Sequence, residues 1–253
     1  MSGIQVEQLD SLNEDDSRYN YDNAVFTEGK AFIYDFQIIS KEGDTLLFRV
    51  PSKDNMYKAP WEFVALDITD KTDVVNQLKI KTLTGLGFMG RSNPGYSQTV
   101  VMYEYLTQDG KIDYNSISGV IENEKNLWAH PPRDYYFNIL ELNPFPYIKF
   151  PLKIGAKWNW ELEIGSKWGD ERWRTWEGNI TNSYSYEVES IKEIDFKDQK
   201  LECYKVIATA ESQLGKTKLN AYFHPEVGFI HLNYTNIDGS QVQLKLNSVQ
   251  APR

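Results

Sequence analysis

Apolar and polar residues alternate with a period of two through most of this chain, and this pattern limits what the chain can fold into. In residues 31–39 (AFIYDFQII), every second side chain from Phe32 to Ile38 is apolar, and Asp35 and Gln37 fall on the opposite face. Successive side chains of a β-strand point to opposite faces, whereas a helix repeats every 3.6 residues. The pattern therefore predicts strands rather than helices.

The same alternation recurs along the chain and is interrupted by Gly, Asn, Asp and Pro residues that favour turns. It predicts about eleven to thirteen strands, at a spacing typical of packed antiparallel sheets. We expect a mainly β protein whose antiparallel sheets form an open, curved half-barrel or a sandwich, with few short helices. Besides 31–39, the predicted strands are 45–50, 61–69, 76–83, 98–107, 111–122, 157–164, 183–191, 201–212, 216–223, 229–235 and 240–247.

Changes in composition divide the chain into four parts. Residues 1–27 are acidic, with few apolar anchors, and we expect a flexible lead-in. Residues 28–127 form an N-terminal β half, 128–152 a proline-rich crossover, and 153–250 a C-terminal β meander. The alternative is one continuous domain over 28–250.

The crossover is the least strand-like part of the body. Prolines fix φ and remove backbone donors, which excludes a central strand here. Between Pro132 and Pro144 the sequence RDYYFNILELN predicts a short helix. We interpret the segment as a stiff crossover that plugs or belts the sheet. The prolines that define it are 131, 132, 144, 146 and 151.

The crossover is also the first candidate ligand site. Trp128, His130, Arg133 and Tyr135, with Tyr136, bring aromatic rings, an imidazole and a fixed cation within nine residues. Such a set suits an acidic or sugar-like ligand, and a rigid proline-rich loop lowers the ordering cost of binding. The structural interpretation explains the same residues, because prolines and aromatic rings also pack together without a ligand.

The second candidate site is the tryptophan hairpin, residues 163–181. Trp168, Trp173 and Trp176 alternate there with charged residues that include Arg172. Tryptophans at a charged turn are poorly placed for burial, and exposed rings beside polar groups are typical of carbohydrate recognition. A structural ladder of rings capped by arginine, or a surface for a protein partner, would use the same composition.

Catalytic and metal motifs are weak in this sequence. Carboxylates such as Glu161, Glu163 and Asp170 are numerous, but no pair stands out as the acid and base of a glycosidase. There is no G-x-S-x-G nucleophile motif, and His130, His224 and His231 are scattered. We therefore predict no catalytic residues, no metal site and no cofactor.

Charge and hydropathy exclude other classes of partner. The net charge of -9 repels phosphate backbones, so nucleic acid is not expected as a partner. No run approaches the roughly 18 apolar residues of a transmembrane helix. The single cysteine, Cys203, lies in a strand-like run and is interpreted as a buried apolar residue. The oligomeric state stays open.

The C-terminal half resembles bacterial envelope proteins of unknown function. The phrases PLKIGAKW and HPEVGFI carry this resemblance through Gly155, Trp158, Pro225, Val227 and Gly228. The resemblance implies an exported, often lipid-anchored β protein, similar in outline to lipoprotein-carrier-like half-barrels that bind apolar or protein ligands. It supplies no catalytic residues. We expect a periplasmic or surface-anchored location if an export signal precedes this sequence, and a cytoplasmic one if the chain is complete.

These observations favour a non-catalytic envelope β protein. Its expected partner is a small apolar or sugar-like ligand, or another protein. The alternative is a protein that binds or hydrolyses carbohydrate through the tryptophan hairpin.

Overall fold

The computed structural model describes residues 23–50, 61–83, 98–108 and 110–252, and within them the chain is almost entirely strand. Two short 3-10 helices interrupt the strands: η1 (Tyr135–Leu142) and η2 (Ser166–Trp168). The strands are β1 (Ala31–Ile39), β2 (Thr45–Arg49), β3 (Glu62–Ala65), β4 (Val74–Thr82), β5 (Thr99–Thr107), β6 (Ile112–Glu122), β7 (Asn126–Ala129), β8 (Tyr147–Lys149), β9 (Lys157–Gly165), β10 (Asn179–Phe196), β11 (Gln199–Ser212), β12 (Gly215–His224), β13 (Gly228–Thr235) and β14 (Gln241–Gln250).

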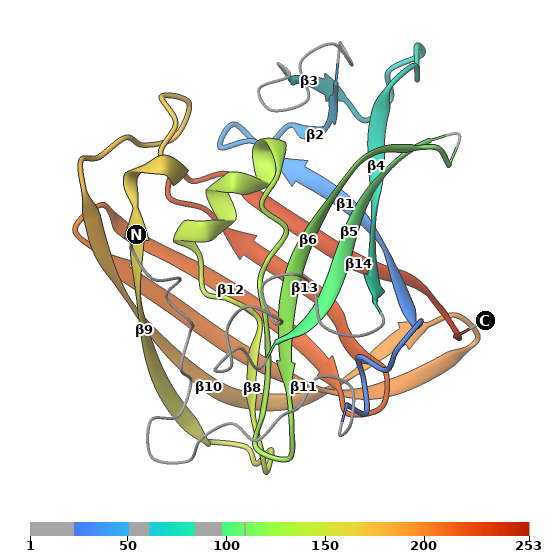
Figure 1. Cartoon of the computed structure of the whole chain (residues 1–253), viewed down its shortest axis with the longest axis vertical. Coiled ribbons are helices and arrows are strands. Elements are labelled where there is room, and N and C mark those ends of the chain that lie inside the picture. Colours follow the sequence, from blue (N-terminus) through green and yellow to red (C-terminus); the bar gives the residue numbers. More distant parts are fainter. Residues whose placement is uncertain (1–22, 51–60, 84–97, 109, 253) are drawn as a thin grey trace.

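All these strands belong to one antiparallel sheet that curves until it is nearly closed into a barrel (Figure 1). The strand order is β8-β7-β6-β5-β4-β2-β1-β14-β13-β12-β11-β10-β9, with β3 attached to β2 and a further pairing of β4 with β1. The mainly β, antiparallel fold with few short helices is thus confirmed. Of the two predicted forms, the structure has the curved half-barrel and not the sandwich.

Aromatic side chains bridge the two ends of this strand order, β8 and β9. The ring centroids of Tyr147 and Trp158 lie 5.8 Å apart, and those of Trp128 and Trp160 lie 5.6 Å apart. Trp158 and Trp160 stack in turn on Tyr186 and Tyr184 of β10. Ring packing therefore joins the edges of a sheet that backbone pairing leaves open at this point.

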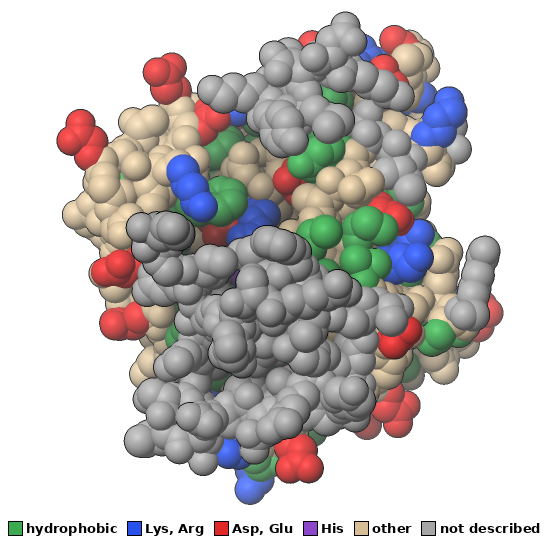
Figure 2. Space-filling model, viewed as in Figure 1, with side chains coloured by type: hydrophobic (Ala, Val, Ile, Leu, Met, Phe, Trp, Pro, Cys, Tyr) green, Lys and Arg blue, Asp and Glu red, His purple; other side chains and the backbone are tan. Residues whose placement is uncertain are grey.

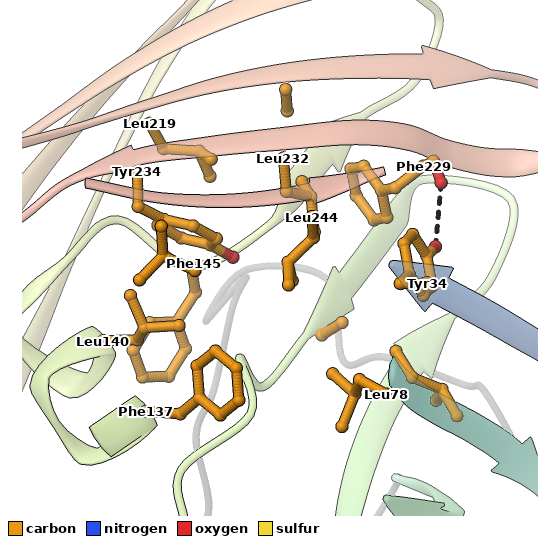
Figure 3. Close-up of a cluster of buried hydrophobic side chains, with 14 of the residues drawn as sticks. Tyr34, Leu78, Phe137, Leu140, Phe145, Leu219, Phe229, Leu232, Tyr234 and Leu244 are labelled. Atoms are coloured by element: carbon orange, nitrogen blue, oxygen red, sulfur yellow. Dashed lines mark hydrogen bonds between the residues drawn. The ribbon is translucent and has the colours of Figure 1, made fainter. Parts of the chain in front are cut away.

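The proline-rich crossover carries η1 into the concave side of the sheet, where it acts as a plug. Its side chains Phe137 and Leu140, with Phe145 just beyond it, face Leu219, Tyr234 and Leu244 from the opposite strands (Figure 3). Phe137 and Leu140 are fully buried. The predicted short helix between Pro132 and Pro144 is confirmed, and the crossover fills the interior of the sheet.

Polar side chains of the sheet satisfy the backbone at the end of the plug. The Leu142 carbonyl accepts hydrogen bonds from Asn182 Nδ2 at 3.1 Å and Thr217 Oγ1 at 2.8 Å. Asn143 Nδ2 donates to the Thr235 carbonyl at 2.9 Å. Buried backbone groups are costly without partners, so these residues fix where the plug ends.

A second segment is anchored at residues 23–26, before β1. One carboxylate, Glu122, accepts hydrogen bonds from the backbone N–H groups of Ala24, Val25 and Phe26 at 2.9, 2.7 and 2.8 Å. Val25 and Phe26 are buried against the sheet. Residues 1–22 of the predicted lead-in lie outside the described part of the chain, as does the Gly-rich segment 85–97.

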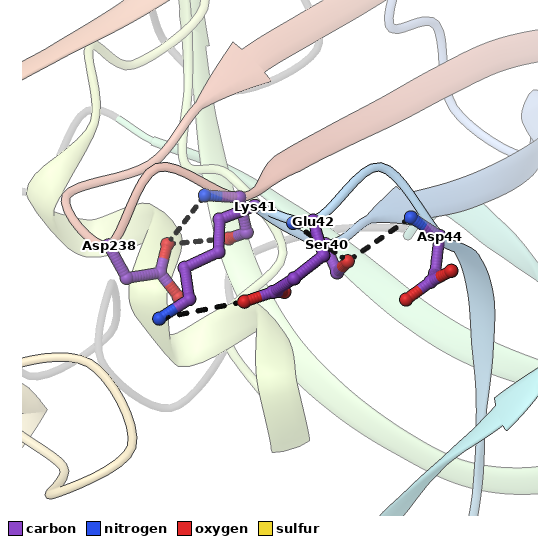
Figure 4. A network of polar contacts seen from close by, with 6 residues as sticks. Ser40, Lys41, Glu42, Asp44 and Asp238 are labelled. Carbon is purple, nitrogen blue, oxygen red and sulfur yellow. Dashed lines mark hydrogen bonds and ion pairs between the residues drawn. The ribbon is translucent and has the colours of Figure 1, made fainter.

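Tight turns join neighbouring strands at one end of the sheet. Ser40 Oγ accepts from the backbone N–H groups of Glu42 and Asp44 in the β1–β2 turn, and Asp238 in the β13–β14 turn accepts from Ser240. Figure 4 shows these two turns side by side. Gly43 and Gly239 have φ of 100° and 89°, a conformation that glycine adopts without strain.

Two strands, β7 and β8, were not predicted from the alternation, and both lie at one end of the strand order. β7 and β8 are only four and three residues long, and β8 lies between Pro146 and Pro151. Prolines are tolerated in short edge strands, because the outer side of an edge has no partner for the missing donor. The crossover thus contributes to the sheet as well as to its interior.

Candidate functional site

The structure brings parts of the two predicted sites together at one open end of the barrel. The guanidinium carbon of Arg133, just before η1, lies 5.8 Å from the ring centroid of Trp168 in η2. The rings of Tyr136 and Trp173 lie 6.2 Å apart, edge to face. Trp61, next to β3, and Phe63, within it, also pack on Tyr136, with ring centroids 5.4 and 5.1 Å away. We call these residues, with Arg172, the rim cluster: Trp61, Phe63, Arg133, Tyr136, Trp168, Arg172 and Trp173.

Arg133 is held on the inner side of this cluster by groups from the plug and from β6. Its Nη1 lies 3.6 Å from Oε1 of the buried Glu141, and its Nη2 donates to Ser118 Oγ at 3.2 Å. The neighbouring Asp134 accepts from Tyr105 OH at 3.0 Å and from Ser116. Burial raises the pKa of Tyr105 well above its ordinary value, so this hydroxyl is a donor at neutral pH. The position of Arg133 is therefore fixed by packing on both sides.

Tyr135, the first residue of η1, has an unusual backbone conformation. Its φ is 54°, in the left-handed region that costs a non-glycine residue about 1–3 kcal/mol. The ring is held by Phe48, Tyr105 and Tyr114, with centroid distances of 5.6, 5.7 and 5.5 Å. Aromatic packing of this extent offsets the backbone strain and sets the sharp turn into η1.

The loop that follows η2 is closed around Arg172. Arg172 Nε donates to Asp170 Oδ1 at 2.8 Å, and its Nη2 donates to the second carboxylate oxygen. Its guanidinium carbon also lies 4.0 Å from the Trp61 ring centroid and 5.5 Å from that of Trp173. Hydrogen bonds from Arg172 hold the pKa of Asp170 below its ordinary value. The ion pair is therefore charged at neutral pH and lies between two rings.

The three tryptophans of the hairpin differ in exposure. Trp173 is only 7% exposed, so the expectation that charged turn residues keep it in solvent is wrong for this ring. Its burial follows from Tyr136 packing and from the hydrogen bond of its Nε1 to the Trp168 carbonyl at 3.3 Å. Trp168 and Trp176 are half-buried, and Trp176 Nε1 donates to the Ile164 carbonyl at 3.4 Å. Trp168 therefore offers more accessible ring surface than Trp173.

Trp128 and His130 lie apart from the rim cluster, in the core between β7 and the plug. Trp128 is fully buried, and its ring lies 4.5 Å from His130, 5.6 Å from Phe145 and 5.6 Å from Trp160. The His130 carbonyl accepts a hydrogen bond from Tyr103 OH. These contacts give Trp128 and His130 a packing role in the structure. Of the first predicted site, Arg133 and Tyr136 contact the hairpin, whereas the Tyr135 ring packs on Phe48, Tyr105 and Tyr114.

Trp61 and Phe63 were not among the residues selected from the sequence. Phe63 is 43% exposed, and both residues belong to the stretch 61–69, which the sequence predicted only as a strand. The sequence WEFVA shows the alternation of a strand. It does not indicate that this strand would lie against η1. Figure 2 shows one face of the molecule, with a hollow in which hydrophobic, basic and acidic side chains lie together.

Three carboxylates near the hairpin, Glu161, Glu163 and Asp170, have hydrogen-bond partners within the protein. Glu161 accepts from Ser183 and Glu163 from Asn179, both on the exposed side of β9. The lowered pKa of Asp170 is the opposite of what a general acid needs. Among residues 23–50, 61–83, 98–108 and 110–252, no group of three or more His, Cys, Asp or Glu side chains could hold a metal ion.

The remaining histidines have local roles. His224 Nδ1 accepts from the backbone N–H of Glu226 at 3.2 Å, and the His231 ring lies 5.7 Å from that of Tyr222. Burial lowers the pKa of His231, and nearby Lys245 adds to this.

No helix in the described part of the chain is both long and apolar enough to span a membrane.

No family model and no curated protein matches this sequence. Among solved structures, a "putative exported protein with YmcC-like fold" from Bacteroides fragilis is 11% identical, with a TM-score of 0.45 over 90% of this chain and 98% of that chain. A "putative lipoprotein" from Parabacteroides distasonis is 12% identical, with a TM-score of 0.46 over 89% and 97%. The "hypothetical lipoprotein YmcC" from Escherichia coli is 10% identical, with a TM-score of 0.34 over 92% of both chains. These descriptions name the class of protein that the C-terminal half resembles in sequence.

Proposed function

We propose that this protein is a non-catalytic envelope component that binds a small ligand at the rim cluster. The observation that carries the proposal is the meeting of two segments at one open end of the barrel. The 133–136 segment and the 166–176 loop are far apart in sequence, yet Arg133 lies against Trp168 and Tyr136 against Trp173. A site assembled from separate, well-packed elements holds its side chains in place before a ligand arrives.

The balance of apolar and polar groups at the rim supports ligand binding. Half-buried rings adjoin guanidinium and carboxylate groups whose positions are fixed by hydrogen bonds. Ligand sites typically combine an apolar lining with a small number of placed polar groups. Packing explains Trp173, which is buried, whereas Phe63 and the Arg172 side chain are 43% and 48% exposed, so a ligand can reach them.

Thermal stability in the presence of candidate ligands tests this proposal. A ligand that binds only the folded state stabilises it by about 2.7 kcal/mol at one hundred times its Kd, which raises Tm by roughly 5–10 °C for a domain of this size. We expect such a ligand to lose most of its effect with Trp168→Ala. NMR chemical-shift changes confined to the outer face of β11 and β12 would contradict the rim as the site.

We also propose an envelope location, which the sequence resemblance around Gly155, Trp158 and Gly228 supports. Fractionation of the source cells checks it. Recovery of the protein in the periplasmic or membrane fraction is expected, and recovery only in the cytoplasm would contradict this part of the proposal.

A further inference from the structure

We infer that the ligand of the rim cluster is a neutral carbohydrate. This inference rests on the proposed function and names its ligand class. It follows from three properties of the cluster: its charges are already paired, its rings remain partly accessible, and the interior beneath it is filled.

The charges at the rim are compensated within the protein. Arg172 is paired with Asp170, and Arg133 lies 3.6 Å from Glu141. The loop over residues 167–178 contains three basic and three acidic residues, so its formal charge is zero. An anionic ligand would compete with these carboxylates and would also approach a chain of net charge -9. The rim therefore offers no net attraction to an anion.

Paired charges remain useful to a ligand with hydroxyl groups. A guanidinium has five N–H donors, and a carboxylate accepts at several positions, so an ion pair still has free hydrogen-bonding capacity. The Arg172 side chain is 48% exposed and that of Asp170 is 27% exposed, which leaves this capacity open to solvent. A sugar hydroxyl both donates and accepts, and it replaces the water on such a pair without adding charge.

The rings supply the second element of carbohydrate recognition. Trp168 is half-buried, and its cationic neighbours are the fixed Arg133 at 5.8 Å and Lys167 at 5.0 Å, of which Lys167 is exposed. The Lys167 side chain can move away, because it lies on the solvent side of the loop. The apolar face of a sugar ring can then lie against the indole, as aromatic surfaces with polar neighbours favour.

An apolar ligand fits this end of the barrel less well. The plug occupies the interior that a fatty chain would need, with Phe137, Ile139 and Leu140 fully buried. At the rim itself, an apolar molecule would cover the Arg172 and Asp170 pair and remove its water without replacing it, which is unfavourable. A neutral, polyhydroxylated ligand avoids both costs.

Isothermal titration calorimetry with probes of three classes tests the inference. The neutral probes are maltohexaose, cellohexaose, mannohexaose and hexa-N-acetylchitohexaose, the acidic probe is hexagalacturonate, and the apolar probe is palmitate. The variants are Trp168→Ala and Arg172→Met, the second at a side chain that is 48% exposed. Tyr222→Ala is the matched control, a half-buried ring on the outer side of β12.

We expect a neutral hexasaccharide to bind, with an affinity that falls about tenfold in Trp168→Ala and stays within about twofold in Tyr222→Ala. The affinity should also change little between about 50 and 500 mM salt, because no net charge is paired on binding. If Trp168→Ala lowers the unfolding temperature, Arg172→Met gives the same test in a folded protein. Binding of hexagalacturonate or palmitate alone, with the same sensitivity to the variants, would overturn the carbohydrate inference and leave the ligand site standing. Binding of no probe, or binding that neither variant changes, would overturn both.

Discussion

Replacement of Phe137 by alanine tests whether the plug is part of the folding core. Phe137 is fully buried in η1, and the centroids of Phe36, Phe48 and Tyr105 lie 5.1, 5.8 and 5.9 Å from its ring. Those three rings come from β1, β2 and β5. A plug that merely rests against the sheet would lose little from this change, whereas an integral plug would lose a junction between three strands.

The magnitude follows from these contacts. Burying a phenylalanine side chain contributes about 1.5–3 kcal/mol, and each aromatic pair adds about 0.5–1.5 kcal/mol. Measured replacements of buried Phe by Ala cost about 3–5 kcal/mol once the cavity is included. With three ring contacts, we expect a loss of about 4–5 kcal/mol in the free energy of unfolding. A typical domain has about 5–15 kcal/mol in total, so the variant should be close to unfolding.

Urea unfolding followed by far-UV circular dichroism and by tryptophan fluorescence measures this loss. Phe63→Ala is the matched control, because Phe63 is 43% exposed and should cost about 1 kcal/mol or less. Coincident transitions from the two probes would show that the plug and the sheet unfold together. A loss below about 1 kcal/mol for Phe137→Ala, or one equal to that of Phe63→Ala, would refute the view that the plug is integral.

Three further predictions concern the anchor of residues 23–26, the cysteine and a histidine. Glu122→Ala removes the acceptor of three backbone N–H groups and should lower the free energy of unfolding by about 2–4 kcal/mol. Hydrogen exchange at Ala24, Val25 and Phe26 should become faster. The control Glu124→Ala, at an exposed residue, should leave exchange there unchanged. Cys203 is fully buried and burial raises its pKa to about 11, so a thiol reagent should react only after unfolding; fast reaction of the native protein would contradict this burial. The pKa of His231, measured by NMR titration, should lie below 6.5, because burial disfavours its charged form. The unfolded chain then binds more protons at low pH, so the contribution of His231 to stability is complete above pH 6.5 and is lost as the pH falls from 6.5 through the folded-state pKa. A measured pKa above 6.5 would reverse the direction of this pH dependence.

The strands of this fold could be predicted from alternation because each has one face on the core. β1 matches its predicted range of 31–39, and strands of the C-terminal meander begin and end within a few residues of the expected positions. β10 was predicted over 183–191 but extends from Asn179 to Phe196, because its pairings with β9 and β11 continue where the apolar alternation weakens. Alternation reports burial, whereas the backbone ladder sets where a strand ends.

The candidate site could be predicted only in part, because its geometry depends on tertiary contacts. Composition pointed to Arg133 and to the 168–176 hairpin, but nothing in the sequence indicates that the two would meet. Trp128 was selected as a ring beside a cation, yet a tryptophan next to prolines is equally suited to the core, where it lies. Trp61 joins the site only because β3 pairs with β2 and brings the ring over Tyr136.

The plug explains why a ligand should bind at the rim rather than inside the barrel. To open the interior, η1 would have to leave, which exposes Phe137, Ile139 and Leu140 at about 1.5–3 kcal/mol each. Its departure would also break the hydrogen bonds from Asn182 and Thr217 to the Leu142 carbonyl, at about 1 kcal/mol each. The sum of roughly 6–11 kcal/mol is comparable to the whole stability of a domain. A small ligand with a micromolar Kd releases only about 8 kcal/mol, so it would gain little or nothing from entering, whereas the rim is accessible without any rearrangement of the plug.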